Sequence, residues 1–330
     1  DKKEGIPASV FIEFTAIESI LKEGLESLNA ALDTRSELVQ WSSFIQSDYQ
    51  NLTSLNAAPL KVNNFIYENL IKVYQGGIFC SATLMVNDDF RYFGEKVGLD
   101  LAVIDHHVKE RIYHSPFHYN DQVKLFVFRG SINVNDPLFM NEIGSQIEKI
   151  FTSLKKRMLV LCTSFKQILA LKNYIEPKLR DNDCKLFVQA PGISRNVLVK
   201  SYCGNPHSIL IGTSSFWEGV DFPGDKVEIL YIVKTPFENP FDPMVQAQIE
   251  DYKQRGDDPF LQFQIPEAAM RFRQGFGRLI RNMDDTGICV VGDTRLYKRG
   301  YGQTILGSLP VDPIPYQTVD TLLLESQKFF

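Results

Sequence analysis

The sequence lacks the features that mark several classes of protein. No apolar run approaches the roughly 18 residues that a membrane-spanning helix needs, and the polar start DKKEG does not resemble a signal peptide. We therefore expect a cytoplasmic protein with no membrane partner. The formal net charge is −5, which argues against binding duplex DNA by bulk electrostatics but leaves room for a local basic groove.

Cysteine pairs are also absent. The five cysteines, which include Cys184 and Cys203, form no C-x-x-C pair. The other three, Cys80, Cys162 and Cys289, lie in apolar, strand-like runs. This pattern indicates reduced core residues. We expect neither a structural zinc site nor an iron–sulfur cluster in this segment.

What is present is typical of a globular protein. The chain has 330 residues, 44% of them hydrophobic and 23% charged, which suits one large or two ordinary domains with an ample core. The first residue is Asp rather than Met, which is compatible with a piece of a longer protein.

The hydrophobic pattern changes at about residue 75. Residues 1–75 have helical periodicity, including the stretch SELVQWSSFIQSDY. Short apolar runs then alternate with helical segments, notably at 139–154, 164–179 and 266–282. The runs that predict strands are 77–82, 101–105, 124–128, 157–162, 185–189, 208–212, 227–233 and 287–293. Continuous apolar strands separated by helices predict an α/β fold, a doubly wound parallel sheet with helices on both faces, preceded by a helical segment.

Ligands of such sheets bind at the carboxyl ends of the strands, and three strand ends are chemically unusual. SATL (81–84) is a small, hydroxyl-rich turn. Thr163-Ser164-Phe165 follows the predicted strand at 157–162. A hydroxyl that only caps the following helix explains this turn equally well. The third is GTSSFWEGVDFPG (212–224).

The loop at 212–224 is the richest of the three. Hydroxyls and amides suit phosphate contacts, aromatic rings suit base stacking, and carboxylates can orient arginines, a metal or a ribose. The side chains concerned are Thr213, Ser214, Ser215, Phe216, Trp217, Glu218 and Asp221. The alternative is a structural loop in which Trp217 fills the core.

The stretch RQGFGRLIRN (273–282) carries three arginines and two glycines inside a predicted helix. At about 100° per residue, Arg271, Gln274, Arg278 and Arg281 fall within roughly an 80° arc. The apolar residues Phe272, Phe276, Leu279 and Ile280 fall on a separate arc, which predicts a buried stripe.

No acidic residue lies at helical spacing within that cationic face, so we expect an external anion or a distant carboxylate to meet it. Gly275 and Gly277 would each cost about 1 kcal/mol relative to Ala inside a helix. A backbone or ligand that approaches closely would explain them; a solvated arginine face is the alternative.

A further motif lies at residues 105–107. Asp105-His106-His107 follows a predicted strand and is similar to the metal triplet of DHH phosphoesterases. Those enzymes also need an earlier aspartate pair on a strand, which the largely helical preceding residues do not offer. We therefore interpret His106 and His107 as loop residues and expect no metal site.

Together SATL, GTSSFWEGVD and QGFGRLIR resemble motifs III, V and VI of superfamily 2 helicases, in the form found in the DinG and XPD group. The segments at 114–127, 233–243 and 290–310 also resemble DinG, so the similarity covers roughly residues 60–310. One departure is KTPF (234–237), where a leucine-proline-phenylalanine is commoner.

The resemblance implies a two-lobed RecA-like motor, with ATP between the lobes and single-stranded DNA across both. ATP and Mg²⁺ would be held mainly by a first lobe with a P-loop and a DExH box; neither motif is here, since the chain has no Gly-Lys and no Asp-Glu dipeptide. The chain then reads as the end of an arch-like insertion (1–75), the tail of the first lobe (76–120) and the complete second lobe (121–330).

The resemblance also implies roles for individual residues. Arg278 and Arg281 would be arginine fingers that reach the γ-phosphate, and Gln274 would position water or phosphates. Glu218 and Asp221 would couple the nucleotide state to the DNA track. The nucleic-acid contacts would come from Ser164, Thr213 and Ser214, with Phe216 or Trp217 stacking or packing beside them.

Two functions remain open on the sequence. The first is the C-terminal motor lobe of an ATP-dependent helicase or helicase-nuclease, a monomer whose partners are single-stranded DNA and its own first lobe; RNA is left open, and this segment alone would be inactive. The second is a non-hydrolysing single-strand-binding module, with any catalysis, such as an exonuclease, in an upstream domain.

Overall fold

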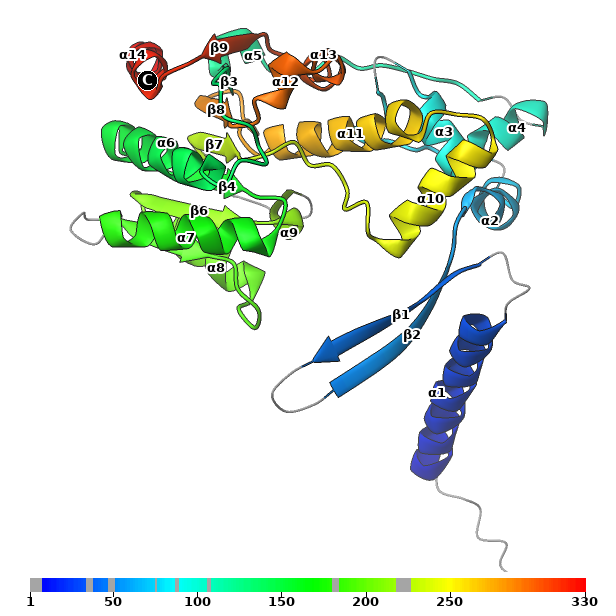
Figure 1. The fold of residues 1–330 in the computed structure, drawn as a ribbon. Coiled ribbons are helices and arrows are strands. Elements are labelled where there is room, and N and C mark those ends of the chain that lie inside the picture. Colours follow the sequence, from blue (N-terminus) through cyan, green and yellow to red (C-terminus); the bar gives the residue numbers. More distant parts are fainter. Residues whose placement is uncertain are drawn as a thin grey trace, which may run out of the picture.

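The computed structural model describes residues 8–33, 38–46, 51–74, 76–86, 89–105, 108–179, 184–217 and 227–330. An α/β lobe makes up the second part of the chain, and a segment with little core of its own precedes it. Helix α1 (Ala8–Leu32) and the hairpin of β1 (Leu38–Gln46) and β2 (Asn51–Pro59) project away from the lobe (Figure 1). Among the described residues, no helix is both long and apolar enough to cross a membrane.

The lobe is built on one sheet, which has seven strands in the part of the chain that the structure describes, in the order β5-β6-β4-β7-β8-β3-β9. Every neighbouring pair is parallel. The strands are β3 (Val123–Phe128), β4 (Met158–Leu161), β5 (Lys185–Val188), β6 (Ser208–Gly212), β7 (Ile229–Ile232), β8 (Gly287–Val291) and β9 (Pro313–Tyr316). The predicted fold class is confirmed, and each predicted strand from residue 124 onward corresponds to one of these; β9 was not predicted.

Helices separate the strands along the chain. The predicted helix at 139–154 is confirmed as α6, and the one at 164–179 begins one residue later, as α7. The lobe's helices are α5 (Tyr119–Gln122), α6 (Phe139–Leu154), α7 (Phe165–Leu179), α8 (Arg195–Cys203), α9 (Ser214–Trp217), α10 (Pro243–Gln254), the π-helix η2 (Phe260–Gln264), α11 (Ile265–Phe276), α12 (Arg295–Lys298), α13 (Tyr301–Gly307) and α14 (Val319–Phe329).

Alternation along the strands produces two cores. Side chains of a strand point to opposite faces in turn, so Leu125 and Val127 pack with residues of α8, α11 and α13, whereas Phe126 and Phe128 pack with α6, α7 and α14. Both faces are therefore covered. The carboxyl ends of all seven strands lie along one edge, because the strands are parallel.

The segment before the lobe is not wholly helical, so the prediction for residues 1–75 is wrong in part. Residues 38–46 and 51–59 pair as an antiparallel hairpin, in which Trp41 lies opposite Asn56 and Phe44 opposite Thr53. Each strand supplies the other's backbone partners, and that cross-strand pairing outweighs a weak helical pattern. The helical parts are α1, α2 (Asn63–Ile66) and the π-helix η1 (Tyr67–Ile71).

Two predicted strands of the first-lobe tail are also wrong. Residues 101–105 belong to α4 (Leu99–Asp105), which follows α3 (Arg91–Val97) after a left-handed Gly98 with φ +79°. Residues 77–82 pair with no described strand, and Ile78 is 93% exposed. A strand needs a neighbour to satisfy its backbone groups, and the described residues offer none there.

The cysteines follow the same division. Cys162 and Cys289, in strands or directly after them, are buried free thiols, as predicted. Cys80 is exposed, because the run at 77–82 joins no described sheet, so its prediction as a core residue is wrong.

Candidate functional site

Helix α11 carries the arginine segment but ends earlier than predicted. Its last residue is Phe276, and Gly277 is the C-cap, with its N–H bonded to the Arg273 carbonyl at 2.9 Å. The Asp285 carboxylate then accepts the N–H groups of Arg281 and Asn282 at 2.8 Å each. The chain therefore turns after Gly277, and the predicted single helical face is wrong for Arg278 and Arg281.

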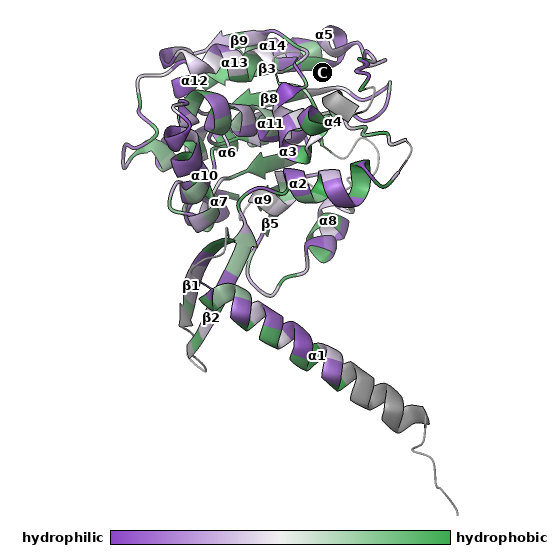
Figure 2. Ribbon diagram, turned by 90° about the vertical axis from the view of Figure 1, so that its right-hand side faces the viewer, coloured by the Kyte–Doolittle hydropathy of each residue, from purple (hydrophilic) through white to green (hydrophobic). Residues whose placement is uncertain are grey.

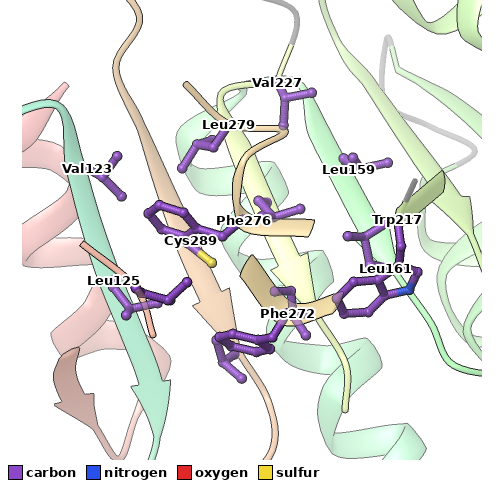
Figure 3. Close-up of a cluster of buried hydrophobic side chains, with 14 of the residues drawn as sticks. Val123, Leu125, Leu159, Leu161, Trp217, Val227, Phe272, Phe276, Leu279 and Cys289 are labelled. Atoms are coloured by element: carbon purple, nitrogen blue, oxygen red, sulfur yellow. The ribbon is translucent and has the colours of Figure 1, made fainter. Parts of the chain in front are cut away.

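The buried back of this segment is confirmed. Phe272, Phe276, Leu279 and Ile280 are at most 4% exposed and belong to the core beneath the sheet. Phe272, Phe276 and Leu279 lie against the strands in Figure 3. Core packing therefore holds the arginine segment both before and after the turn at Gly277.

The two glycines serve different purposes. A methyl group on Gly275 would lie 2.5 Å from Trp217 Cε3 and 3.2 Å from Leu161 Cδ1, so only glycine admits the indole ring. A methyl group on Gly277 would make only ordinary contacts, at 3.5 Å from two carbonyl oxygens. We expected a backbone or a ligand to approach both glycines; instead a side chain, that of Trp217, approaches Gly275, and Gly277 ends the helix.

Arg278 joins the arginine segment to the loop that follows β6. Its Nε and Nη2 donate to the Trp217 carbonyl oxygen at 3.0 and 2.7 Å. Arg281 is partly buried, and burial lowers the pKa of its guanidinium, an effect that the nearby Asp285 carboxylate opposes. A guanidinium in this position stays charged and gains from any anion that offsets its lost hydration.

Arg271 and Gln274 meet different partners. Arg271 forms an ion pair with Glu238, which is the distant carboxylate that the sequence predicts for this face. Gln274 Nε2 lies 3.5 Å from Thr83 Oγ1, in the SATL turn. Its Oε1 is buried and has no hydrogen-bond partner among the described residues. Gln274 thus presents an unsatisfied acceptor between the two segments.

At the carboxyl end of β6, Thr213 is buried and bonded to the end of the neighbouring strand. Gln189 Oε1 accepts the N–H of Thr213 at 2.7 Å and its hydroxyl at 3.1 Å, while Gln189 Nε2 donates to Ser215 Oγ at 3.0 Å. Ser214 begins α9. Glu218 and Asp221 lie outside the described residues.

The two aromatic residues of this loop belong to the core. Phe216 is fully buried, and Trp217 is 3% exposed and donates from Nε1 to the Cys162 carbonyl at 3.1 Å. In this position neither ring offers a face to a base. Their arrangement matches the packing role that the sequence left open beside stacking.

Ser164 is exposed at the carboxyl end of β4. Its Oγ accepts the N–H of Gln167 at 3.3 Å, as a capping hydroxyl does. Gln167 in turn bonds to Thr163 through both side-chain amide atoms. Ser164 therefore caps α7 and still faces solvent.

Sequence reasoning missed two groups at the same edge. Gln189 directly follows β5, so the search for polar residues after strands could have found it. Asp293 follows β8, is fully buried, binds Arg295 with both carboxylate oxygens and accepts the N–H of Thr235 at 2.8 Å. Burial alone would raise the pKa of Asp293, but the bonds from Arg295 and Thr235 outweigh it and leave the pKa below its usual value.

No group of three or more metal-ligating side chains occurs within the described ranges. His106 and His107 lie outside the described residues, so the prediction for the triplet at 105–107 stays a prediction.

Residues 147–312 match the model of the helicase C-terminal domain family. The chain belongs to this family. The match runs from α6 to the residue before β9 and includes the arginine segment and the loop after β6. Of the three helicase-like motifs, only SATL lies before it.

Curated relatives assign the chain to the DinG group of superfamily 2 helicases, as its C-terminal portion. It is 35% identical over 290 residues to the ATP-dependent DNA helicase YoaA of Haemophilus influenzae, covering 87% of this chain and 44% of that protein. Identity to YoaA of Escherichia coli is 35% (79% and 39% covered), and to the 3'-5' exonuclease DinG of Bacillus subtilis 29% (84% and 30%). The chain thus spans less than half the length of these relatives.

Solved structures agree with the fold. A structure titled XPD_Helicase superposes with a TM-score of 0.57 at 15% identity, over 91% of this chain and 51% of that one. One titled XPD_APO gives 0.58 at 14%, over 93% and 59%. At such identities the similarity concerns the fold alone, which is RecA-like.

Proposed function

We propose that this chain is the C-terminal motor lobe of an ATP-dependent DinG-type DNA helicase. The observation that carries the proposal is the convergence of three motifs far apart in the sequence. Gln274 lies 3.5 Å from Thr83, and Arg278 bonds to the Trp217 carbonyl. A site in which SATL, the loop after β6 and the arginine segment meet suits a motor that must sense nucleotide and nucleic acid together.

In the proposed mechanism, ATP and Mg²⁺ are held mainly by a first RecA-like lobe outside this chain. Arg278 and Arg281 reach the γ-phosphate and stabilise the charge that develops during transfer. Gln274 orients the attacking water or the phosphates. Glu218 and Asp221 stay predictions as the residues that relay nucleotide state. ATP draws the lobes together and hydrolysis releases them, which moves the protein along a strand.

The nucleic-acid contacts are proposed at the carboxyl ends of β4 and β6. Ser164 is exposed and can donate its hydroxyl to a phosphate, and Ser214 stays a prediction as a second donor. Thr213 is buried and bonded to Gln189. It therefore contributes to nucleic-acid binding only indirectly, by holding the shape of the loop. Phe216 and Trp217 support the loop by packing.

The proposed domains follow the same division: an arch-like insertion to about residue 75, the tail of the first lobe to 120, and the second lobe from 121. The chain alone is then inactive in ATP hydrolysis, because the nucleotide's main binding groups belong to the other lobe.

The test measures DNA-stimulated ATP hydrolysis by the full-length protein. Arg278→Ala and Arg281→Ala should each lower kcat by about 10³-fold while nucleotide binding is largely kept. Arg255→Ala is the matched control, because Arg255 pairs with Asp251 on α10, away from the arginine segment. Arg278→Lys keeps the positive charge but loses the planar fork of the guanidinium. This variant and a thermal melt of each protein distinguish loss of the arginine's function from a defect in folding. Normal hydrolysis in both alanine variants would contradict the proposed roles of the two arginines. Absence of DNA-stimulated hydrolysis by the parent protein would favour a non-hydrolysing binding module.

A further inference from the structure

The polar face of α11 meets residues from outside the helix at three successive positions. Glu267, Arg271 and Gln274 are four and three residues apart, so they lie along one side of the helix. Glu267 contacts α3, Arg271 contacts Glu238, and Gln274 lies near Thr83. Two of the three partners belong to the segment before the lobe, which lies beside the start of α11 in Figure 1.

Of these three residues, Glu267 has two partners on α3. Its side chain is 11% exposed, and one carboxylate oxygen accepts from the hydroxyl of Tyr92 at 2.5 Å and from the ammonium of Lys96. Tyr92 and Lys96 are one turn apart on α3, so a single helix face supplies both donors. Burial, and then the negative charge of Glu267, raise the pKa of the Tyr92 hydroxyl. Tyr92 therefore stays protonated at physiological pH and donates a hydrogen bond to Glu267.

Beside this contact is a polar cleft of about 330 Å³, whose walls include Lys96, Glu238, Asp242, Gln248, Glu267 and Arg271. Two ion pairs line the cleft, Lys96–Glu267 and Arg271–Glu238, beside the buried apolar side chains of Val245 and Phe263. Ion-paired groups next to a cleft can exchange partners without opening a core. The contacts of Glu267 with Tyr92 and Lys96 are therefore polar contacts that join α3 to α11 beside this cleft.

A second ion pair between the same two parts of the molecule provides a comparison. Lys61 binds Asp251 on α10 at 2.6 Å, and the Lys61 side chain is 50% exposed. It joins the N-terminal segment to the lobe without touching α11. It therefore separates general docking of the segment from an effect on the arginines.

We infer that Tyr92 and Lys96 are positioning residues, which hold Glu267 and, together with the core packing of the opposite helix face, set the placement of α11 and of the arginine segment beyond it. The helix rises about 1.5 Å per residue, so Glu267 lies about 15 Å along the axis from the C-cap at Gly277. A short helix moves as a rigid body, and the turn at Gly277 passes its displacement to Arg278. The consequence for turnover rests on the proposed function; the placement of α11 does not.

The first test uses the full-length protein. Lys96→Met and Tyr92→Phe should each lower the kcat of DNA-stimulated ATP hydrolysis by about tenfold, with the KM for ATP unchanged, because a misplaced catalytic group affects the transition state more than binding. Lys96→Arg should restore most of the rate. Lys61→Met should leave kcat unchanged. Equal losses in Lys96→Met and Lys61→Met, or no loss in Lys96→Met, would overturn the inference.

The second test needs no hydrolysis and uses the 330-residue chain. Its two tryptophans are Trp41 and Trp217, and the Trp217 ring packs on Gly275 of α11. In a Trp41→Phe background, the double variant Tyr92→Phe, Lys96→Met should raise acrylamide quenching of Trp217 about twofold, since local opening exposes the ring. Lys61→Met should not change it. Unchanged quenching in the double variant would overturn the inference whatever the arginine variants show, whereas normal ATPase in both Arg278→Ala and Arg281→Ala would overturn only the proposed function.

Discussion

The segment before residue 121 and the lobe after it bury their apolar side chains very differently. Among the described residues, the buried hydrophobic side chains before Val123 are Tyr67, Val86 and Ala102, while every strand of the lobe packs side chains into or against one or both of the two cores. On α1, Leu21 and Leu25 are 68% and 60% exposed. Figure 2 shows apolar and polar residues alternating along this projecting helix.

This contrast indicates where the stability of the chain comes from. Burial of apolar area is the main favourable contribution to folding, so the lobe holds itself together, while the N-terminal segment is held by local hydrogen bonds and a few contacts. Examples are Gln40, whose amide donates to the carbonyls of Ala30 and Asp33 at 2.6 and 2.8 Å, and the pair Lys61–Asp251. Substitutions in the two parts should therefore have unequal effects.

The greatest loss of stability should come from removing a buried aromatic ring. Trp217→Ala should lower the free energy of unfolding by about 3–5 kcal/mol, because it leaves a cavity against Leu161 and Gly275. Phe44→Ala, in the hairpin, removes a ring that is 63% exposed and should change it by less than about 0.5 kcal/mol. Urea denaturation followed by circular dichroism compares them. Similar losses would show that the hairpin belongs to the same core.

A smaller effect, dependent on pH, should come from the buried carboxylate after β8. Asp293→Asn should lower the free energy of unfolding by roughly 2–3 kcal/mol at pH 7, because Arg295 loses its charged partner while remaining partly exposed to water. The folded-state pKa of Asp293 is depressed, so its contribution is present above the ordinary carboxyl pKa and is lost as the pH falls through the folded-state value.

The difference between the variant and the parent should therefore be constant from pH 7 to about 5 and shrink below about 4. Urea titrations at a series of pH values measure it. A difference that stayed constant down to pH 3 would mean that Asp293 does not contribute through its charge, because any lowered folded-state pKa makes the contribution fall below the unfolded-state pKa. Asp312→Asn, at an exposed carboxylate on the lobe surface, is the control and should show no such trend.

Next in size is a buried hydrogen bond compared with an exposed one. The hydroxyls of Tyr231 and Tyr316 both donate to Gln146 Oε1, at 2.8 and 2.7 Å. Tyr316→Phe should cost about 1 kcal/mol. Ser43→Ala breaks the exposed pair with Ser54 in the hairpin and should cost almost nothing. Equal costs in the same denaturation assay would mean that the hairpin is as well shielded from water as the lobe.

Much of the lobe could be predicted from the sequence, since its buried strands are continuous apolar runs. β9 escaped because PIPY contains two prolines, which remove ladder donors and are tolerated only at a sheet edge; β9 is an edge strand beside β3. The hairpin escaped because LVQWSSFIQ alternates too irregularly to distinguish the two periods. Residues 77–82 have an apolar run, but a strand forms only beside a partner.

The candidate site shows a similar division. The buried face of the arginine segment followed from helical spacing, which held as far as Phe276 and for the packing of Leu279 and Ile280. The position at which the helix ends could not be predicted from that spacing. It depends on a glycine C-cap and on Asp285, whose carboxylate accepts two backbone N–H groups of the turn. The partner of Gly275 also lay beyond local pattern: Trp217 reaches it only through the order of the strands.

The least change of all is expected on α1. Leu21→Ala and Leu25→Ala, made together, should change the free energy of unfolding by less than about 0.5 kcal/mol, because both side chains are largely exposed and Ala favours a helix at least as well as Leu. Urea denaturation of the 330-residue chain measures this, with Glu26→Ala, also exposed on α1, as the control. A loss above about 1 kcal/mol that grows with protein concentration would show that Leu21 and Leu25 pack against a second copy of the chain. The contrast between an open segment and a closed lobe would then describe the single chain and not its state in solution.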